Sequence, residues 1–244
     1  MNDKYLYLLV NIGTVLFPFL FSFEKKVAYY KWWKYLFPAL ITTAAVFLIW
    51  DHYFTKIGVW GFNEQYLTGN KLFGLPFEEI LFFFTVPYAS IFIYAFVNKF
   101  WPATPILDKI AKPISIIILL IAVVLLILHF DKAYTALNCG YAILLLGMQL
   151  LLIKGPYMGK FYRFYLWHLI PFFIVNGILT GTGINGEVVW YNNAENLGIR
   201  LGTIPVEDSL YSLSLMLMNI SIFEWLKGRN ALKENVGPSK TKIK

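Results

Sequence analysis

The sequence predicts an all-α integral membrane protein with about seven transmembrane helices. Of its 244 residues, 58% are hydrophobic and 14% are charged, whereas a soluble domain carries about 25% charged residues. The apolar residues gather in seven stretches of about 17–22 residues, each long enough to cross a hydrocarbon core of about 30 Å as a helix. The third observation is an internal repeat, because the first three stretches resemble the last three in layout.

The expected helices follow one another with short polar connections. They span residues 5–22, 35–54, 77–97, 113–129, 133–153, 161–180 and 206–226. The fourth stretch has no functional-looking polar side chain before His129, so we expect a connector helix that faces lipid. This connector returns the chain to its starting side. The two flanking three-helix repeats therefore run parallel, related by a pseudo-two-fold axis along the membrane normal.

This organisation divides the chain into four parts. We expect a first repeat over residues 1–112, a connector over 113–132, a second repeat over 133–226 and a basic cytoplasmic tail over 227–244. The net charge of +7 does not indicate nucleic-acid binding, since the basic residues mostly flank apolar spans or lie in the tail. Of the 21 Lys and Arg residues, five lie on the N-terminal side of the predicted membrane and 16 on the other side. The positive-inside rule then predicts an outer N-terminus and a cytoplasmic C-terminus in the cell membrane.

A duplicated motif carries acidic residues into the membrane. Residues 60–79 read WGFNEQYLTGNKLFGLPFEE, and residues 190–208 read WYNNAENLGIRLGTIPVED. Each motif runs from Trp through a polar loop to Pro, one apolar residue and two adjacent acids. The first helical turn suits Pro and favours anions, so capping is the structural alternative. Ionisable groups at the mouth of a membrane helix are costly, however, and a matched pair predicts one functional site built twice.

The predicted catalytic residues are Glu78 and Glu79 in the first motif and Glu207 and Asp208 in the second. We expect Glu78 and Glu207 to lead, with their neighbours as partners, because adjacent residues on a helix point about 100° apart. A carboxyl group beside an apolar pocket can keep its proton near neutral pH, donate it, and later remove another. Aromatic faces stabilise a nearby cation. The pattern, without metal ligands or a nucleotide loop, favours proton-initiated chemistry on an apolar alkene with no metal and no cofactor.

Further polar and aromatic residues are candidates for substrate binding or cation stabilisation. They are Asp51, Trp60, Phe82, Asn176, Trp190 and Tyr211. The alternatives are an interfacial position for Asp51, an interhelical hydrogen bond for Asn176 and simple packing for Phe82. We expect a structural role for His168.

The motifs LPFEE, NGILTG and RLGTIPVEDSLYS resemble those of the membrane-integral lycopene cyclases. These enzymes occur as paired small subunits in some bacteria and as fused domains in archaea, other bacteria and fungi. The resemblance covers nearly the whole chain, from the first span to about Lys227. The chain looks like the fused two-repeat form, without an added phytoene synthase region.

The resemblance implies a lycopene β-cyclase of carotenoid biosynthesis, an isomerase that closes the ends of lycopene into β-rings. Lycopene and γ-carotene would be its substrates, the lipid bilayer its surroundings, and no cofactor would be needed. The sequence leaves open the ring regiochemistry and whether the chain forms a homo-oligomer.

Two other classes remain as alternatives. A seven-helix retinal protein would need a Schiff-base lysine in the last span, and residues 206–226 contain none. A secondary transporter is compatible with parallel repeats. Only the transporter would leave lycopene unchanged while moving another substrate.

Overall fold

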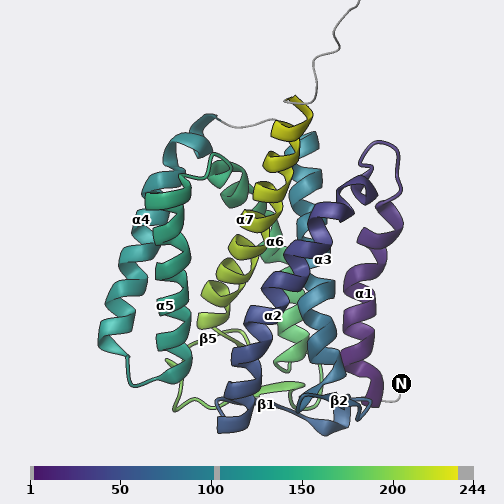
Figure 1. The fold of residues 1–244 in the computed structure, drawn as a ribbon. Coiled ribbons are helices and arrows are strands. Elements are labelled where there is room, and N and C mark those ends of the chain that lie inside the picture. The colour runs from purple at the N-terminus through teal and green to yellow at the C-terminus, as the bar shows by residue number, and fades with distance from the viewer. Residues whose placement is uncertain (1–2, 102–104, 236–244) are drawn as a thin grey trace, which may run out of the picture.

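The computed structural model describes residues 3–101 and 105–235, and this part of the chain is mainly helical (Figure 1). Its α-helices are α1 (Leu6–Phe21), α2 (Trp33–Ile57), α3 (Phe77–Phe100), α4 (Pro105–Leu128), α5 (Ala133–Met148), α6 (Met158–Leu179) and α7 (Glu207–Asn235). A π-helical turn, Gln149–Ile153, extends α5. The short strands are β1 (Trp60–Phe62), β2 (Lys71–Leu72), β3 (Leu75–Pro76), β4 (Val189–Tyr191), β5 (Arg200–Leu201) and β6 (Ile204–Pro205).

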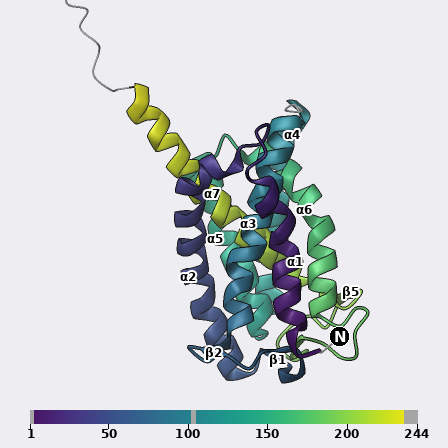
Figure 2. The ribbon, with the colours of Figure 1, turned by 90° about the vertical axis from the view of Figure 1, so that its right-hand side faces the viewer.

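Six helical segments of the described chain are long and apolar enough to cross a membrane. The exception among the seven helices is α6, which carries Lys160, Arg163 and His168 within an otherwise apolar run. It nevertheless runs alongside the other helices in both views (Figures 1 and 2) and packs against α3 and α4. The predicted fold class, an all-α membrane protein of about seven helices, is confirmed.

Two helices extend by more than a turn beyond their predicted limits. α4 begins at Pro105, so the predicted boundary between residues 112 and 113 falls inside this helix. α7 continues to Asn235, so the predicted tail begins as helix, and residues 236–244 lie outside the described ranges. The prediction followed the apolar runs, whereas helices also continue past the hydrocarbon core, where long charged side chains reach the interface.

The two sets of three helices pack in corresponding ways. α1 lies against α3, and α5 lies against α7. The middle helices also contact the opposite repeat, because α2 packs on both α3 and α7 and α6 packs mainly on α3. α4 covers α5 and α6 from outside (Figure 1). The acid-bearing helices α3 and α7 therefore contact each other in the interior of the bundle.

Each acidic motif folds as a tight hairpin that leads directly into its helix. The turn between β2 and β3 places Phe73 at φ 53° and Gly74 at φ 80°, and the turn between β5 and β6 places Gly202 at φ 67°. Positive φ angles at such positions are typical of two-residue hairpins. Pro76 and Pro205 lie in β3 and β6, just before the helices rather than in the first turn. The hairpins thus fix where α3 and α7 begin.

Strands β1 and β4 join the two motifs across the pseudo-two-fold axis. They are antiparallel, and Gly61 pairs with Trp190 at their centre. The alignment that equates Glu78 with Glu207 also equates these two residues, so the ladder is symmetric about its middle pair. A Cβ on Gly61 would lie 2.3 Å from the Trp190 ring, which only glycine avoids. Both motifs therefore lie at one end of the bundle, as the parallel repeats predict.

Candidate active site

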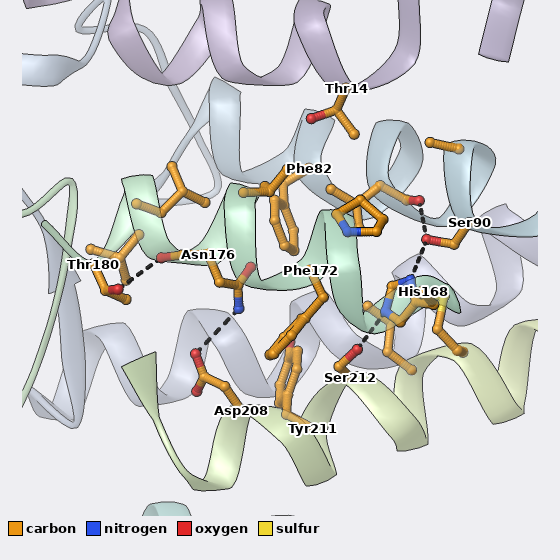
Figure 3. A pocket seen from close by; sticks show the side chains of 18 of the residues that line it. Thr14, Phe82, Ser90, His168, Phe172, Asn176, Thr180, Asp208, Tyr211 and Ser212 are labelled. Carbon is orange, nitrogen blue, oxygen red and sulfur yellow. Dashed lines mark hydrogen bonds between the residues drawn. The ribbon is translucent and has the colours of Figure 1, made fainter. Parts of the chain in front are cut away.

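A largely apolar cavity of about 400 Å³ lies between α1, α3, α6 and α7 and begins at the end of the bundle that holds the two motifs. The second acid of each motif, Glu79 and Asp208, lines it, together with side chains from all four helices. Figure 3 shows Asn176 of α6 directed at Asp208, with Phe172 and Tyr211 facing each other deeper inside. The cavity is therefore an apolar space with carboxyl groups at one end.

The acidic end of the cavity is built from equivalent residues of the two repeats. Its lining contains the equivalent pairs Glu79 and Asp208, Phe82 and Tyr211, Val86 and Leu215, Trp60 and Val189, and Tyr7 and Tyr134. The positions on α3 follow one another at spacings of three and four residues, as do those on α7, so each helix presents one face. Residues of both repeats thus line one cavity.

Equivalent tyrosines hold the two cavity acids. The Tyr7 hydroxyl donates a hydrogen bond to Glu79 Oε2 at 2.5 Å, and the Tyr134 hydroxyl donates one to Asp208 Oδ1. Asp208 Oδ2 accepts two more, from the Tyr191 hydroxyl at 3.1 Å and from Asn176 Nδ2 at 3.3 Å. The surroundings of the two acids therefore differ, since the described residues give Asp208 three side-chain donors and Glu79 one.

The first acid of each motif accepts a hydrogen bond from the loop that precedes its own hairpin. Glu78 Oε1 accepts a hydrogen bond from the Thr68 amide at 2.8 Å, and Glu207 Oε1 accepts one from the Leu197 amide at 2.7 Å. Glu207 Oε1 also accepts from the Thr135 hydroxyl at 2.8 Å. Both side chains are buried but do not line the cavity. Of the four acids, Glu79 and Asp208 therefore line the cavity, whereas Glu78 and Glu207, which were expected to lead, lie beside it.

No basic side chain of the described residues forms an ion pair with these four acids. Lys71, equivalent to Arg200, instead pairs with Glu64 at 2.6 Å on the exposed side of the loop. Arg200 lies over the Tyr191 ring, 5.5 Å from its centre. Burial, followed by the Asp208 carboxylate, raises the pKa of Tyr191 well above its usual value. Tyr191 therefore remains a neutral hydroxyl donor to Asp208.

Asp51 lies behind Trp60, which lines the cavity. Its Oδ1 accepts a hydrogen bond from Trp60 Nε1 at 2.7 Å, and Asp51 does not line the cavity, whereas Trp60 does. The Trp60 ring lies 5.3 Å from that of Tyr134 and 6.2 Å from that of Tyr191. Trp190, which the sequence pattern indicated as a candidate for substrate binding, is 37% exposed and lies outside the cavity, because its ring covers Gly61.

The cavity extends to one side of the pseudo-two-fold axis. Its deeper lining comes from α1 and α6 in addition to α3 and α7. On the other side, the corresponding helices α5 and α2 meet through ring contacts: Phe47 lies 5.2 Å from Tyr141 and 5.3 Å from Tyr211, and Trp50 lies 4.9 Å from Tyr141. These aromatic side chains fill the symmetry-related space.

The comparison with protein families agrees with this doubled architecture. The family described as lycopene cyclase matches residues 4–97 and 131–226 of the chain. The chain belongs to the lycopene cyclase family. The two matched segments hold α1 to α3 and α5 to α7, and the unmatched stretch between them holds α4. The match fits the internal repeat with an intervening connector.

Fungal members of the lycopene cyclase family resemble parts of the chain. A bifunctional lycopene cyclase/phytoene synthase of Arthroderma gypseum is 27% identical over 49% of the chain and 19% of its own length. Its namesake in Neurospora crassa is 38% identical over 21% of the chain and 9% of its own length. One from Phaeosphaeria nodorum is 34% identical over 26% and 12%, respectively. The chain thus matches less than a fifth of the length of these relatives. No solved structure matches it.

Sequence reasoning missed the tyrosines that hold the two cavity acids. Tyr7 and Tyr134 lie at equivalent positions in α1 and α5, each four residues before an asparagine, Asn11 or Asn138. This repeated Tyr-x-x-x-Asn pattern is visible in the sequence. Asn11 donates to the Glu78 carbonyl oxygen at 3.0 Å, so the pattern also helps anchor α1 to the start of α3.

His168 lines the cavity but has a structural explanation, as expected. Ser90 donates to the Val86 carbonyl oxygen at 2.7 Å, so its oxygen accepts from His168 Nδ1 at 3.1 Å. His168 Nε2 then accepts from Ser212 at 2.8 Å (Figure 3). The neutral ring ties α3, α6 and α7 together. Among the described residues no lysine lines the cavity, and no group of His, Cys, Asp and Glu could hold a metal ion.

Proposed function

We propose that this chain is a lycopene β-cyclase, which converts lycopene through γ-carotene to β-carotene. The observation that carries the proposal is the placement of Glu79 and Asp208 together at one end of an apolar cavity, each held by an equivalent tyrosine. Family membership and the names of the fungal relatives supply the substrate class. The cavity supplies what the chemistry requires, an acid that meets a hydrocarbon away from water.

The reaction balances as an isomerisation. A proton adds to C2 of the acyclic end and leaves a cation at C1. The C5–C6 double bond attacks C1, closes a six-membered ring and moves the cation to C5. Loss of the C6 proton then gives the β-ring. One proton enters and one leaves, so no electron carrier is consumed, and we propose that the chain works without a cofactor.

We assign the proton donation to Glu79. Within the described part of the chain it has one side-chain donor, Tyr7, whereas three donors stabilise a negative charge on Asp208. Asp208 is therefore better suited to remain a carboxylate that stabilises the cation and accepts the final proton. Glu78 and Glu207 hold the hairpin loops and thereby fix the positions of the two cavity acids.

Aromatic faces around the acids would stabilise the cation between the two proton transfers. Trp60 and Tyr134 line the acidic end, and Phe82, Phe172 and Tyr211 line the space below it. A desolvated cation over such a ring gains about 2 kcal/mol or more. The same side chains exclude water, which would otherwise trap the cation as an alcohol.

The chain is a membrane protein by its apolar helices, and we infer its orientation from charge. The N-terminus and both motifs lie at one end of the bundle, and α7 ends at the other (Figure 1). Of the 21 Lys and Arg residues, 16 lie toward the α7 end. The positive-inside rule favours a cytoplasmic C-terminus and an active site near the outer face.

The test is expression of the full chain in cells that accumulate lycopene, with pigment analysis. We expect β-carotene to form and γ-carotene to appear transiently. Unchanged lycopene, in cells whose membranes contain the protein, would refute the proposal. ε-Ring products would retain cyclisation but reject the assigned regiochemistry.

A further inference from the structure

A second apolar groove of about 620 Å³ lies toward the opposite end of the bundle from the acids. It runs between α1, α3 and α6 and is lined by aromatic and aliphatic side chains, with Glu24 and Lys26 among its lining residues beyond the end of α1. Phe17, Phe92, Ile93 and Pro171 line both the groove and the active-site cavity. The two spaces are therefore neighbours along one path.

The combined path has the length of the membrane core. Along α3 it runs from Glu79 to Phe100, a distance of 21 residues, which corresponds to about 31 Å at 1.5 Å per residue. The hydrocarbon core of a bilayer is about 30 Å thick. A linear hydrocarbon that lay in this path would extend from the acids across the membrane to the region of Trp101 and Trp167.

The lining of the groove suits a flat, rigid hydrocarbon better than a polar molecule. Trp101 and Trp167 lie with ring centres 5.1 Å apart at its far part, and Phe96 and Phe100 lie 4.6 Å apart along one edge. Trp167 and Phe96 are 41% and 44% exposed, so their faces are free to contact an occupant. A polyene would meet aromatic faces along its length and leave no polar group unpaired.

We propose that this groove binds the part of the carotenoid that is not reacting, so that the substrate spans the membrane during cyclisation. The proposal rests on the proposed function and adds the second half of the substrate site. One end of the substrate lies at Glu79 and Asp208, and the other lies near Trp101 and Trp167. Because the acids occupy one end of the path only, each binding event closes one ring. The half-cyclised product must leave and rebind in the reverse direction.

The test is a substitution that places a large side chain in the groove, far from the acids. Ile170 of α6 lines the groove and is 56% exposed, and Ile174, one turn along, is 59% exposed and lines neither the groove nor the cavity. Ile170→Trp and Ile174→Trp therefore form a matched pair. Purified full-length variants in lipid vesicles are given lycopene or a shortened apocarotenal that keeps one acyclic end.

We expect Ile170→Trp to lower kcat/KM for lycopene at least about tenfold and to leave the shortened substrate within about twofold of the parent protein. Ile174→Trp should change neither value. Equal losses on both substrates, or no difference between the two variants on lycopene, would overturn the proposal. Either result would mean that the groove holds lipid or serves only as packing.

A binding measurement separates this proposal from the proposed function. Each variant is combined with Glu79→Gln, and the lycopene retained after purification from lycopene-containing membranes is measured. Loss of retained lycopene with Ile170→Trp but not with Ile174→Trp supports the groove even if no variant cyclises. Equal retention in the two variants rejects it even if the parent protein is an active cyclase.

Discussion

The comparison of Glu79→Gln with Glu78→Gln tests the central assignment most directly. The two side chains are adjacent, buried and chemically identical, yet only Glu79 lines the cavity. Glutamine keeps the size of either side chain and its carbonyl oxygen, so Tyr7 can still donate to residue 79 and the Thr68 amide to residue 78. What each substitution removes is the proton that the carboxyl group could transfer.

The size of the expected effect follows from the role of each residue. A positioned general acid contributes about 10²–10⁴-fold to rate, and a hundredfold loss corresponds to about 2.7 kcal/mol of transition-state stabilisation. We expect Glu79→Gln to lose at least about a hundredfold in turnover of lycopene. Glu78→Gln keeps its loop hydrogen bond and should stay within about threefold of the parent rate.

The assay measures the initial rate of γ-carotene and β-carotene formation in membranes, normalised to the amount of each variant that is inserted. Glu79→Asp is a useful companion, since it keeps a titrating group but withdraws it by one methylene. Equal losses in Glu78→Gln and Glu79→Gln would refute the reasoning, because a hairpin cap and a proton donor would then be indistinguishable. A larger loss in Glu78→Gln would restore the first acid of each motif as the leading group.

Three further outcomes are expected. Tyr7→Phe removes the one side-chain donor that the described residues give to Glu79. A hydrogen bond to a charged group contributes about 1.5–3 kcal/mol, so we expect roughly a tenfold or greater change in rate, and an unchanged rate would deny Tyr7 a role. A slowed variant such as Phe82→Leu or Tyr211→Phe should accumulate γ-carotene before β-carotene in a time course, and closure of both rings with no monocyclic species would contradict a single cavity. A reporter fused after Lys244 should be active on the cytoplasmic side, and activity only on the outer side would reverse the orientation.

The sequence was sufficient for the parts of the fold that depend on apolar length and repetition. Seven helices, their parallel repeats and the placement of both motifs at one end follow from hydropathy and from the duplicated motif. The start of α4 at Pro105 and the end of α7 at Asn235 did not follow, because both lie in charged stretches where hydropathy gives no signal. Helix ends at an interface are set by backbone hydrogen bonding and packing as much as by the membrane.

The sequence pointed to the residues of the candidate site but not to which acid of each pair faces the cavity. The motif pointed to both acid pairs, to Phe82 and to Tyr211; one acid of each pair lines the cavity with these two rings, and Asn176 donates a hydrogen bond to Asp208. The sequence could not tell which acid of a pair faces the cavity, since a rotation of about 100° separates neighbours and the hairpin geometry selects one. Nor could it place Trp190 on Gly61, a contact that depends on pairing between β1 and β4.

Under the proposed function, the departure from two-fold symmetry explains how one duplicated chain can hold a single linear substrate. Perfect symmetry would give two branches to the cavity, one between α1 and α6 and one between α5 and α2. The second branch is filled by the contacts of Phe47, Trp50 and Tyr141, whereas the first continues into the apolar groove. The same asymmetry divides the acids, because Asn176 of α6 donates a hydrogen bond to Asp208, whereas among the described residues Tyr7 of α1 is the side-chain donor to Glu79. Two equivalent carboxyl groups thereby acquire different surroundings, which is the condition for one to give a proton and the other to take it. Duplication thus supplies the pair of acids, and the loss of symmetry around them supplies the direction of the reaction.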